Sequence, residues 1–328
     1  MELITGATGF IGLALARRLS ASGLKVRCLV RPGTGAQALG LPGVELCRGD
    51  LLDNASLEAA VKGVDRVWHL AALVRPEGRL VGRKDLLRRF RETNALATGR
   101  LAEAAAEAGV KRLVYFSSIA ALGPGESLPD NAPPRPLTMY GRSKMLGEAE
   151  LKRTAAKTGL RYVIIRPAMI YGRGAKGWGQ LFRAARGAFT AVPGRADNEY
   201  SVCHVENLLD AALLAAEKGA DGSAFNISEG SLPLRELILA AAALQGKHPF
   251  LLPLRPGFLR AASARLDALL RLAGLYMPGF AGADRERLEE ACARWSHCSE
   301  GVRALGWKPA VGFGQGLKET MEGALDNA

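Results

Sequence analysis

Thr5-Gly6-Ala7-Thr8-Gly9-Phe10-Ile11-Gly12 is the stretch that decides the fold of this chain. The apolar residues before it are typical of a very short strand, and Ile11–Leu19 has the apolar spacing of a helix. Glycines in such a turn permit positive φ and a close approach of the backbone to a pyrophosphate, whose charge the positive end of the helix stabilises. The stretch therefore predicts a dinucleotide-binding turn made by Gly6, Thr8, Gly9, Phe10, Ile11 and Gly12.

The spacing of these glycines is one residue wider than in the usual dinucleotide fingerprint, and the alternative is a strand-to-helix loop that needs glycine only for packing. The position of the turn favours the cofactor, because a second strand, Val26–Val30, ends at the charged residue Arg31. An arginine there suits a 2′-phosphate, so we predict NADP as the cofactor, with NAD as the alternative. The competing interpretation of Arg31 is an exposed arginine without a ligand.

The composition is that of a globular protein: 328 residues, of which 48% are hydrophobic and 23% charged. No apolar run approaches the ~20 residues of a membrane-spanning helix, and the sequence opens directly into a strand, so we expect a cytoplasmic protein. The five cysteines are odd in number and lack a Cys-x-x-Cys pair, which argues against both a disulfide framework and a zinc site. We therefore expect reduced thiols and no metal.

The net charge of +12 raises the question of nucleic acid, an anionic membrane or an anionic ligand. The densest basic cluster lacks the interleaved aromatic residues of a single-strand-binding groove, so we expect a solvated face and no nucleic acid. Its cations are Arg75, Arg79, Arg83, Lys84, Arg88, Arg89 and Arg91.

Strands alternate with helices over the first half of the chain. We expect further strands at Val44–Cys47, Val64–Ala72, Lys111–Phe116, Arg161–Arg166 and Ala224–Ile227, and helices at Thr93–Ala108, Tyr140–Lys157 and His204–Lys218. Pro124–Pro136 is expected to be a loop. This order, without an internal repeat, predicts an α/β protein with a Rossmann-type, doubly wound parallel sheet.

The remainder of the chain is less regular and predicts a small, mostly helical, C-terminal substrate-binding cap over the carboxyl ends of the strands. Tyr171–Tyr200 is rich in glycine and arginine, and an apolar helix is expected from about Phe258 to Leu272. We predict a dinucleotide-binding domain of residues 1–170 plus about 202–228. The cap is then about 171–201 plus 229–328.

Tyr140 and Lys144 are four residues apart on a predicted helix, so both side chains project from one face. A tyrosine hydroxyl has a pKa of ~10, and a lysine held close to it favours the phenolate and lowers that pKa. Ser118, at the end of a strand, can bond a substrate oxygen while a nicotinamide transfers the hydride. We therefore predict Ser118, Tyr140 and Lys144 as catalytic residues, although Tyr-x-x-x-Lys alone is a common surface-helix coincidence.

Over nearly its whole length the chain resembles the extended short-chain dehydrogenases/reductases of the epimerase/dehydratase superfamily. The matching motifs are Thr5 to Gly12, Gly49-Asp50-Leu51, His69 to Ala72, Phe116-Ser117-Ser118, Tyr140 to Lys144, Arg166 to Gly172, His204 to Asn207 and Leu305 to Pro309. The resemblance identifies Ser118, five residues before Gly123, as the catalytic serine. Besides the glycine turn and Arg31, it implies a cofactor site made by Asp50, Leu51, Leu70, Ala71, Ala72, Asn94, Ser117, Tyr140, Lys144, Pro167, Met169 and Ile170.

Two departures from the family pattern narrow the range of expected activities. Ile119-Ala120 stands where sugar 4,6-dehydratases of the superfamily carry Asp-Glu, which disfavours dehydration. Tyr200-Ser201 stands where nucleotide-sugar epimerases usually have Arg-Asp, and a phenol does not replace a bidentate phosphate clamp. Other arginines of the cap, such as Arg173 or Arg195, could compensate for that loss.

The sequence around Arg31 and the apolar segment Phe250–Phe280 look closer to dihydroflavonol-reductase-like and hydroxysteroid-dehydrogenase-like members. We therefore expect an NADPH-dependent reductase, or the reverse dehydrogenase, acting on a hydrophobic small molecule. The alternatives are a nucleotide-sugar epimerase with a tightly held cofactor and, less favoured, a non-catalytic cofactor-binding regulator. The apolar cap residues could equally only pack the cap against the sheet.

Two expectations concern assembly and surroundings. Small residues in Thr93–Ala108 and Tyr140–Lys157, helices that often pair between subunits in this family, predict a homodimer. A basic edge at Arg260 and Arg271 suggests peripheral contact with an anionic membrane, without a transmembrane segment.

Overall fold

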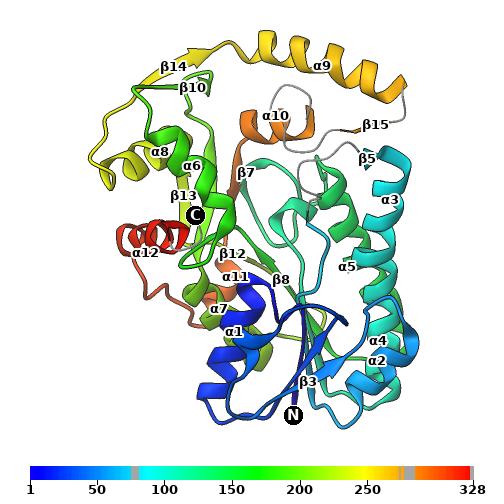
Figure 1. The fold of residues 1–328 in the computed structure, drawn as a ribbon. Helices are drawn as coiled ribbons and strands as arrows, with labels where there is room; N and C mark the ends of the chain where they lie inside the picture. The colour runs from blue at the N-terminus through cyan, green and yellow to red at the C-terminus, as the bar shows by residue number, and fades with distance from the viewer. Residues whose placement is uncertain (75–80, 273–274, 277–284, 326–328) are drawn as a thin grey trace.

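Seven parallel strands form the central layer of the molecule (Figure 1). A computed structural model describes the chain except residues 75–80, 273–274, 277–284 and 326–328. The strands are β1 (Glu2–Thr5), β2 (Val26–Val30), β3 (Val44–Arg48), β4 (Arg66–His69), β6 (Arg112–Phe116), β8 (Tyr162–Pro167) and β12 (Ala224–Ile227). Their order is β12-β8-β6-β4-β1-β2-β3, and all neighbours pair in parallel.

Helices cover both faces of this sheet. One face packs on α1 (Phe10–Ala21) and α7 (Val205–Lys218), and the other on α2 (Asn54–Val61), α4 (Ala97–Glu107) and α5 (Met139–Thr158). Every residue of β6 is buried, with Val114 and Phe116 in the first core and Leu113 and Tyr115 in the second. The alternation of side chains along a strand thus fills two cores, and the predicted doubly wound α/β fold is confirmed.

The strand order reverses between β1 and β4. The chain builds β1, β2 and β3 outward in one direction and β4, β6, β8 and β12 in the other. In open α/β sheets such a reversal leaves a crevice at the carboxyl ends of the two central strands, where ligands bind. The topology therefore places a binding crevice after Thr5 and His69.

The long helix before β6 begins earlier than predicted. It starts as α3 (Arg83–Arg91), passes through a π-helical turn at Glu92–Leu96 and continues as α4, so the predicted start at Thr93 is wrong. Leu86 and Phe90, four residues apart, are buried and anchor the extra turns to the rest of the protein. The basic cluster of this region lies partly outside the described residues, at Arg75 and Arg79.

A second, smaller sheet supports the helical C-terminal region. Its order is β13-β11-β16-β7, with β9 beside β11. The strands are β7 (Gly125–Leu128), β9 (Met169–Tyr171), β11 (Glu199–His204), β13 (Gly230–Pro233) and β16 (Trp295–His297). Two predictions are therefore wrong, because the segment 124–136 contributes strand β7 and the segment 171–200 is regular over much of its length.

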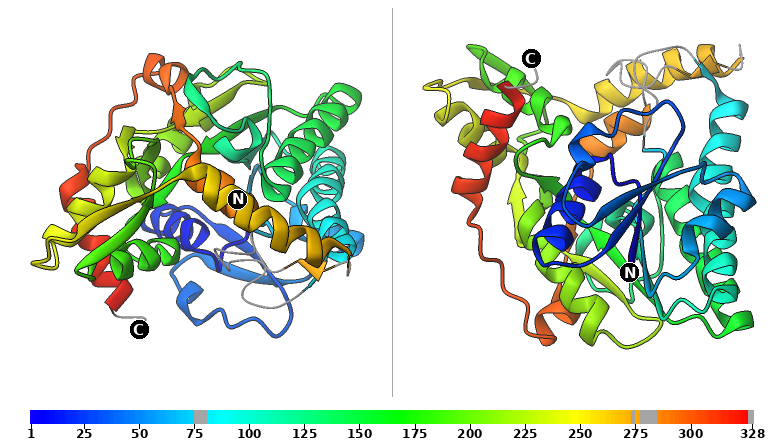
Figure 2. Two further views of the ribbon diagram at one scale, coloured as in Figure 1. Left: turned by 90° about the horizontal axis from the view of Figure 1, so that it is seen from above. Right: turned by 60° about the horizontal axis from the view of Figure 1, so that its bottom comes forward.

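The outer part of the cap consists of helices and a two-stranded ribbon. The helices are α6 (Gly179–Ala185), α8 (Leu234–Ala243), α9 (Pro256–Leu272), α10 (Arg285–Cys292), α11 (Glu300–Ala304) and α12 (Phe313–Leu325), and the ribbon pairs β10 (Phe189–Pro193) with β14 (Phe250–Leu254). Seen from above, α9 runs across the molecule from β14 toward α3 (Figure 2). Near α3, β15 (Leu275–Tyr276) pairs with β5 (Val81–Gly82).

Two further outcomes concern the cap. The predicted domain boundaries at 171 and 229 stay a prediction. Of the apolar cap residues singled out from the sequence, Met277 and Phe280 lie outside the described residues.

Among the described residues, no helix combines the length and the apolar character that a bilayer crossing requires.

Candidate active site

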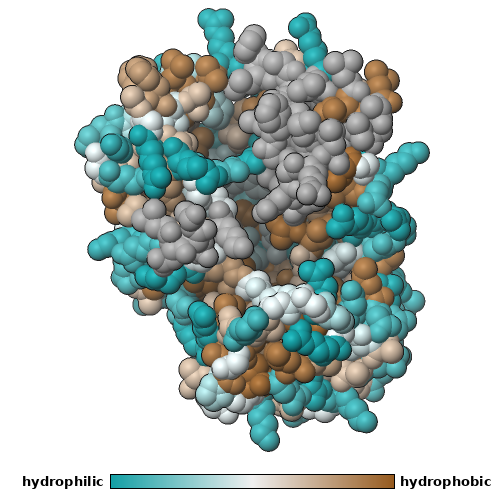
Figure 3. All heavy atoms as spheres, in the orientation of Figure 1, coloured by the Kyte–Doolittle hydropathy of each residue, from teal (hydrophilic) through white to brown (hydrophobic). Residues whose placement is uncertain are grey.

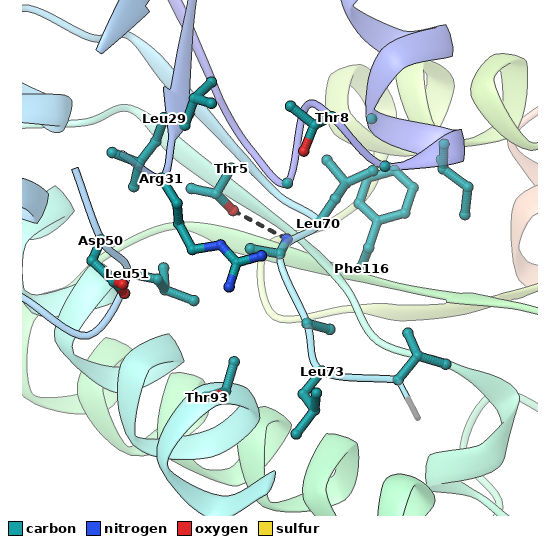
Figure 4. A pocket seen from close by; sticks show the side chains of 18 of the residues that line it. Thr5, Thr8, Leu29, Arg31, Asp50, Leu51, Leu70, Leu73, Thr93 and Phe116 are labelled. Atoms are coloured by element: carbon teal, nitrogen blue, oxygen red, sulfur yellow. Dashed lines mark hydrogen bonds between the residues drawn. The ribbon is translucent and has the colours of Figure 1, made fainter. Parts of the chain in front are cut away.

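A cavity of about 600 Å³ opens at the reversal of strand order, at the carboxyl ends of the central strands. Figure 4 shows its walls, which come from the glycine turn, the ends of β2 and β4, and helices α3 and α5. Predicted site residues among its lining are Gly6, Thr8, Gly9, Phe10, Ile11, Gly12, Arg31, Asp50, Leu51, Leu70, Ala71, Ala72, Ser117, Tyr140, Lys144 and Pro167. Ser118, Asn94, Met169 and Ile170 lie outside that lining.

The glycine turn is closely packed against surrounding backbone and leaves a helix end open toward the cavity. A Cβ on Gly6, whose φ is +76°, would lie 2.6 Å from the amide nitrogen of Ala71, and a Cβ on Gly12 would lie 2.2 Å from the carbonyl oxygen of Gly6. Helix α1 begins after Gly9, without a side-chain cap and without an acidic residue in its first turn. Its first amides and its positive end therefore face the cavity uncompensated, as a pyrophosphate requires.

The end of the cavity beside β2 is polar. The Arg31 side chain extends into the cavity between Asp50 and Leu70, as Figure 4 shows. Oδ1 of Asp50 accepts a hydrogen bond of 2.8 Å from the amide of Leu52, so part of this carboxylate holds its own turn. Arg31 follows β2 directly and supplies positive charge at this end of the cavity. A ribose or a 2′-phosphate would lie at this position.

Asn94 lies behind the cavity wall, in the π-helical turn. Its Oδ1 accepts from the amide of Leu73, and its Nδ2 donates both to the carbonyl oxygen of Leu73, at 2.7 Å, and to Oγ of Ser143, at 2.8 Å. Oγ of Ser143 in turn donates to the carbonyl oxygen of Tyr140. Asn94 therefore ties the segment after β4 to the start of α5, and its predicted contact with the cofactor stays a prediction.

His69 is a packed strand residue. Its Nδ1 lies 2.7 Å from Oγ1 of Thr5 and its Nε2 lies 3.0 Å from Oγ1 of Thr98. Complete burial, with Lys144 nearby, lowers the pKa of His69 to about 3. The imidazole stays neutral and holds Thr5, whose Oγ1 accepts from the amide of Ala71 in the cavity wall.

Tyr140 and Lys144 both reach the cavity from the first turns of α5, which Thr138 caps by accepting from the amide of Gly141. The side chain of Ser118 lies close enough to the hydroxyl of Tyr140 to influence its pKa. Oγ of Ser118 accepts from the amide of Ala120, at 3.1 Å, which fixes the serine at the end of β6. The structure thus brings together the three residues that the sequence selects.

The pKa of Tyr140 differs from the expectation. Burial raises it to about 12, while the side chain of Ser118 acts in the opposite direction. Nζ of Lys144 donates to the carbonyl oxygen of Phe116 at 2.5 Å and lies 4.3 Å above the ring of Tyr115. The net shift of the Tyr140 pKa is therefore upward, opposite to the predicted direction.

The pKa of Lys144 itself is lowered to about 7 by burial, an effect that the carboxylate of Glu148 partly offsets. Glu148 lies one turn further along α5 and forms a buried ion pair with Arg166, with Nη2 and Oε2 2.7 Å apart. Ser117 donates to Oε1 of Glu148 at 2.6 Å, so its hydroxyl points away from the cavity that its residue lines.

Glu148 and Arg166 were missed as contributors to the site. Two features of the sequence indicate these residues. Tyr140, Lys144 and Glu148 follow one another at intervals of four residues on one helix face, and Arg166 is a charged residue inside an apolar strand.

Tyr200 serves the packing of the cap. Its hydroxyl lies 3.1 Å from the carbonyl oxygen of Ala291, 3.3 Å from that of Glu290 and 3.2 Å from Nδ2 of Asn198. Oγ of Ser201 accepts from the amide of His297 at 3.0 Å. The two residues that replace the usual Arg-Asp pair therefore join β11 to the end of α10 and to β16.

Comparison with known proteins decides the family. Residues 2–228 match the model of the NAD dependent epimerase/dehydratase family. The chain belongs to this family. The resemblance to extended short-chain dehydrogenases/reductases is thereby confirmed, and the protein is a member of a group of NAD-dependent oxidoreductases and epimerases.

Among similar proteins, sterol demethylase protein B of Methylococcus capsulatus (strain ATCC 33009 / NCIMB 11132 / Bath) is 32% identical over 257 residues, covering 75% of this chain and 75% of that protein. A 4-hydroxy-2-methyl-3-oxo-4-farnesyl-3,4-dihydroquinoline-1-oxide ketoreductase of Stigmatella aurantiaca is 31% identical, covering 74% of this chain and 72% of that protein. The structure of a Thermus thermophilus UDP-glucose 4-epimerase in complex with NAD superimposes with a TM-score of 0.75 at 26% identity, covering 100% of this chain and 99% of the other.

Proposed function

We propose that this protein is an NADP-dependent oxidoreductase that transfers a hydride between the nicotinamide and a ketone or alcohol of a hydrophobic small molecule. The observation that carries the proposal is one cavity that Tyr140 and Lys144 share with the glycine turn, with Ser118 near Tyr140 behind its lining. A cofactor-binding regulator would have no use for a buried lysine and tyrosine held in this way, because burying them costs stability.

The chain would hold the cofactor at three places. The amides of Gly9 to Gly12 would bind the pyrophosphate, Arg31 the 2′-phosphate, and Tyr140 and Lys144 line the remaining part of the cavity. The bound nicotinamide supplies or accepts the hydride. Because no acidic residue stands at the position of Arg31, a bare ribose would lack its usual partner there.

Tyr140 would act as the proton carrier. Its pKa of about 12 keeps the phenol protonated at neutral pH, so in the direction of reduction it can donate a proton to the oxygen of the carbonyl group. Ser118, near the same hydroxyl, would bind that oxygen and orient it. Lys144, with a pKa of about 7, would place a partly positive ammonium group at the floor of the cavity, where it stabilises negative charge.

Two observations support an apolar substrate over a nucleotide sugar. The Tyr200 hydroxyl is engaged with backbone carbonyl groups of the cap and offers no cation for a diphosphate. Two relatives above 30% identity are named for a sterol and for a farnesylated quinoline ketone. Walls for such a molecule need mainly apolar side chains and one polar end, here Ser118 and Tyr140.

The second candidate is a nucleotide-sugar epimerase with a tightly held cofactor. The end-to-end superposition on the Thermus thermophilus UDP-glucose 4-epimerase favours it, and Arg173 and Arg195 of the cap are cations that could meet a diphosphate. The two candidates differ in stoichiometry, because a reductase consumes NADPH whereas an epimerase returns its cofactor unchanged.

We also propose a homodimer formed through α4 and α5. These helices pack against each other in one chain and present their outer surface along one side of the molecule (Figure 1). Light scattering at micromolar concentration tests this assembly, and a monomer at that concentration would contradict it.

The function is tested by competition. The protein with NADP is mixed with UDP, UDP-sugars and a panel of hydrophobic ketones, and thermal shift and NADPH oxidation are measured. The reductase predicts NADPH oxidation by one or more ketones and no shift with UDP. Saturable UDP-sugar binding without turnover of any ketone would favour the epimerase.

A further inference from the structure

The β10–β14 ribbon carries an apolar face that nothing in the described part of the chain covers. Phe189 and Phe250 are paired in register and are 72% and 62% exposed, and their rings meet edge to face at 6.2 Å. Ala191 and Leu252 form the next exposed pair, and Leu252 is 46% exposed. Large aromatic side chains at such exposure are unusual, because burying one fully contributes ~1.5 to 3 kcal/mol.

The opposite side of the same ribbon is packed in the ordinary way. Thr190 and Val192 alternate with the exposed residues and are buried, and Leu251 contacts the core of the cap. Oγ1 of Thr190 donates to the carbonyl oxygen of Ala184. The ribbon is thus anchored by one face, and its outer apolar face is a fixed surface of the protein.

The segments that carry this face are basic. The two segments that carry the ribbon, residues 174–196 and 237–266, contain no Asp or Glu. Their cations are Lys176, Arg183, Arg186, Arg195, Lys247, Arg255, Arg260 and Arg265. Arg186 and Lys247 precede the two phenylalanines by three residues, and Arg195 and Arg255 follow the other end of the ribbon.

Glu236 and Asp267 border one of these segments, and two other acidic residues near the region are paired. Asp197 forms an ion pair with Arg235, and Glu289 pairs with Arg260 at 3.0 Å. In Figure 3 the apolar atoms over β10 and β14 form a brown patch at the end of the cap, bordered by teal side chains.

We infer that this face, defined by Phe189, Ala191, Phe250 and Leu252 with its flanking cations, docks the protein on an anionic lipid surface. Aromatic and aliphatic side chains that enter the interface, with lysine and arginine beside them, are the combination by which proteins bind such a surface. A second copy of the chain is a poorer occupant, because a twofold interface would bring the same cations face to face. The inference stands independently of the proposed reaction.

Vesicle sedimentation tests the inference with the full chain. We expect the protein to pellet with phosphatidylcholine vesicles that contain about 30 mol% phosphatidylglycerol and to remain in the supernatant with phosphatidylcholine alone. The double variant Phe189→Ser/Phe250→Ser keeps the net charge of +12. We expect it to lower the partition coefficient about tenfold or more, since two apolar anchors are lost.

Two further double variants distinguish vesicle binding through this face from unspecific attraction. Leu24→Ser/Leu46→Ser removes leucines that are 42% and 41% exposed in the loop before β2 and on β3, and should leave binding unchanged. Lys247→Glu/Arg255→Glu should weaken binding and reduce its dependence on salt. Unaltered circular dichroism and an unaltered melting temperature would show that each variant is folded.

Three results would overturn the inference. The first is no sedimentation of the wild type with anionic vesicles at low salt. The second is equal binding by the wild type and the phenylalanine double variant, since attraction by net charge alone would then explain it. The third is an oligomer of the wild type that the double variant loses, which would assign this face to an interface between copies.

Discussion

The floor of the cavity and the cap above it differ in the kind of polar groups that they bury. The floor holds charged side chains: Lys144 in α5, and Glu148 paired with Arg166. In the cap, Tyr200 and Ser201 are satisfied by backbone groups and by other uncharged side chains. Buried charge tolerates the loss of a partner poorly, whereas a neutral hydrogen bond contributes only about 1 kcal/mol. The floor should therefore be the fragile part of the molecule and the cap the tolerant part.

The largest effect is expected for Glu148→Gln. The substitution leaves the guanidinium of Arg166 buried without its carboxylate, and we expect the free energy of unfolding to fall by about 3 to 5 kcal/mol. Chemical denaturation measures it. The matched control is Glu150→Gln on the same helix, whose partner Arg153 is half exposed and whose loss should cost less than about 1 kcal/mol. Similar losses of unfolding free energy in both variants would contradict the difference between the buried and the half-exposed ion pair.

Tyr140→Phe should lower kcat by about 10²-fold or more while cofactor affinity stays nearly unchanged, because only the proton carrier is removed. Tyr162→Phe is the control, since it removes a phenol hydroxyl from β8, outside the cavity lining. Steady-state kinetics and cofactor titration of both variants give the result. Turnover near the wild-type rate in Tyr140→Phe would rule out its assigned role.

Lys144→Met should stabilise the fold in a pH-dependent way. The pKa of Lys144 is about 7 in the folded protein and about 10.5 in the unfolded chain, so unfolding takes up a proton between these values. The penalty of burying the ammonium group is complete below pH 7 and disappears as the pH approaches 10.5.

We therefore expect Lys144→Met to raise the free energy of unfolding by about 4 kcal/mol at pH 7 and by less than about 1 kcal/mol at pH 10. Denaturation at the two pH values measures the difference. Lys152→Met, on the exposed side of the same helix, should show no such dependence, and a pH-independent effect of Lys144→Met would argue against a depressed pKa.

Arg31→Ala should reduce the preference for NADP over NAD about tenfold. A hydrogen bond from a cation to a phosphate contributes ~1.5 to 3 kcal/mol, and Arg31 extends into the cavity. Titration of both cofactors into the variant and into the wild type compares the affinities. Arg17→Ala, on α1 and outside the cavity lining, serves as the control. Equal affinity ratios in the wild type and Arg31→Ala would mean that Arg31 does not select the cofactor.

In the cap, Tyr200→Phe should cost only about 1 kcal/mol of stability, because it removes a neutral hydrogen bond to the backbone. Its kcat should remain within about twofold of the wild-type value, since its hydroxyl is bound to the cap backbone. A loss of UDP-sugar binding in this variant would assign Tyr200 to a diphosphate site.

The sequence predicted the floor well because its parts are short and local. The glycine turn, the strands after it and the pair Tyr140 and Lys144 each follow from spacing within a few residues. The π-helical turn at Asn94 and the Glu148–Arg166 pair were not predicted, because they depend on contacts between segments 18 or more residues apart.

The cap was predicted poorly for the same reason. Its sheet joins β7, β11 and β16, which lie far apart in the chain, and β16 is only three residues long. No local alternation of three residues distinguishes such a strand from a loop. The direction of the Tyr140 pKa shift also required the structure, because it is set by the burial of the phenol, which the spacing of Tyr140 and Lys144 does not reveal.

The most direct test of the central claim follows the hydride itself. NADPH carrying deuterium at both hydrogen positions of C4 of the nicotinamide is incubated with the protein and each member of the panel of hydrophobic ketones and UDP-sugars, and products are analysed by mass spectrometry. The account predicts one deuterium at the carbinol carbon of a reduced ketone for each NADPH oxidised, and none with Tyr140→Phe. Interconversion of a UDP-sugar without net NADPH oxidation, or NADPH oxidation without transfer of the label, would contradict it.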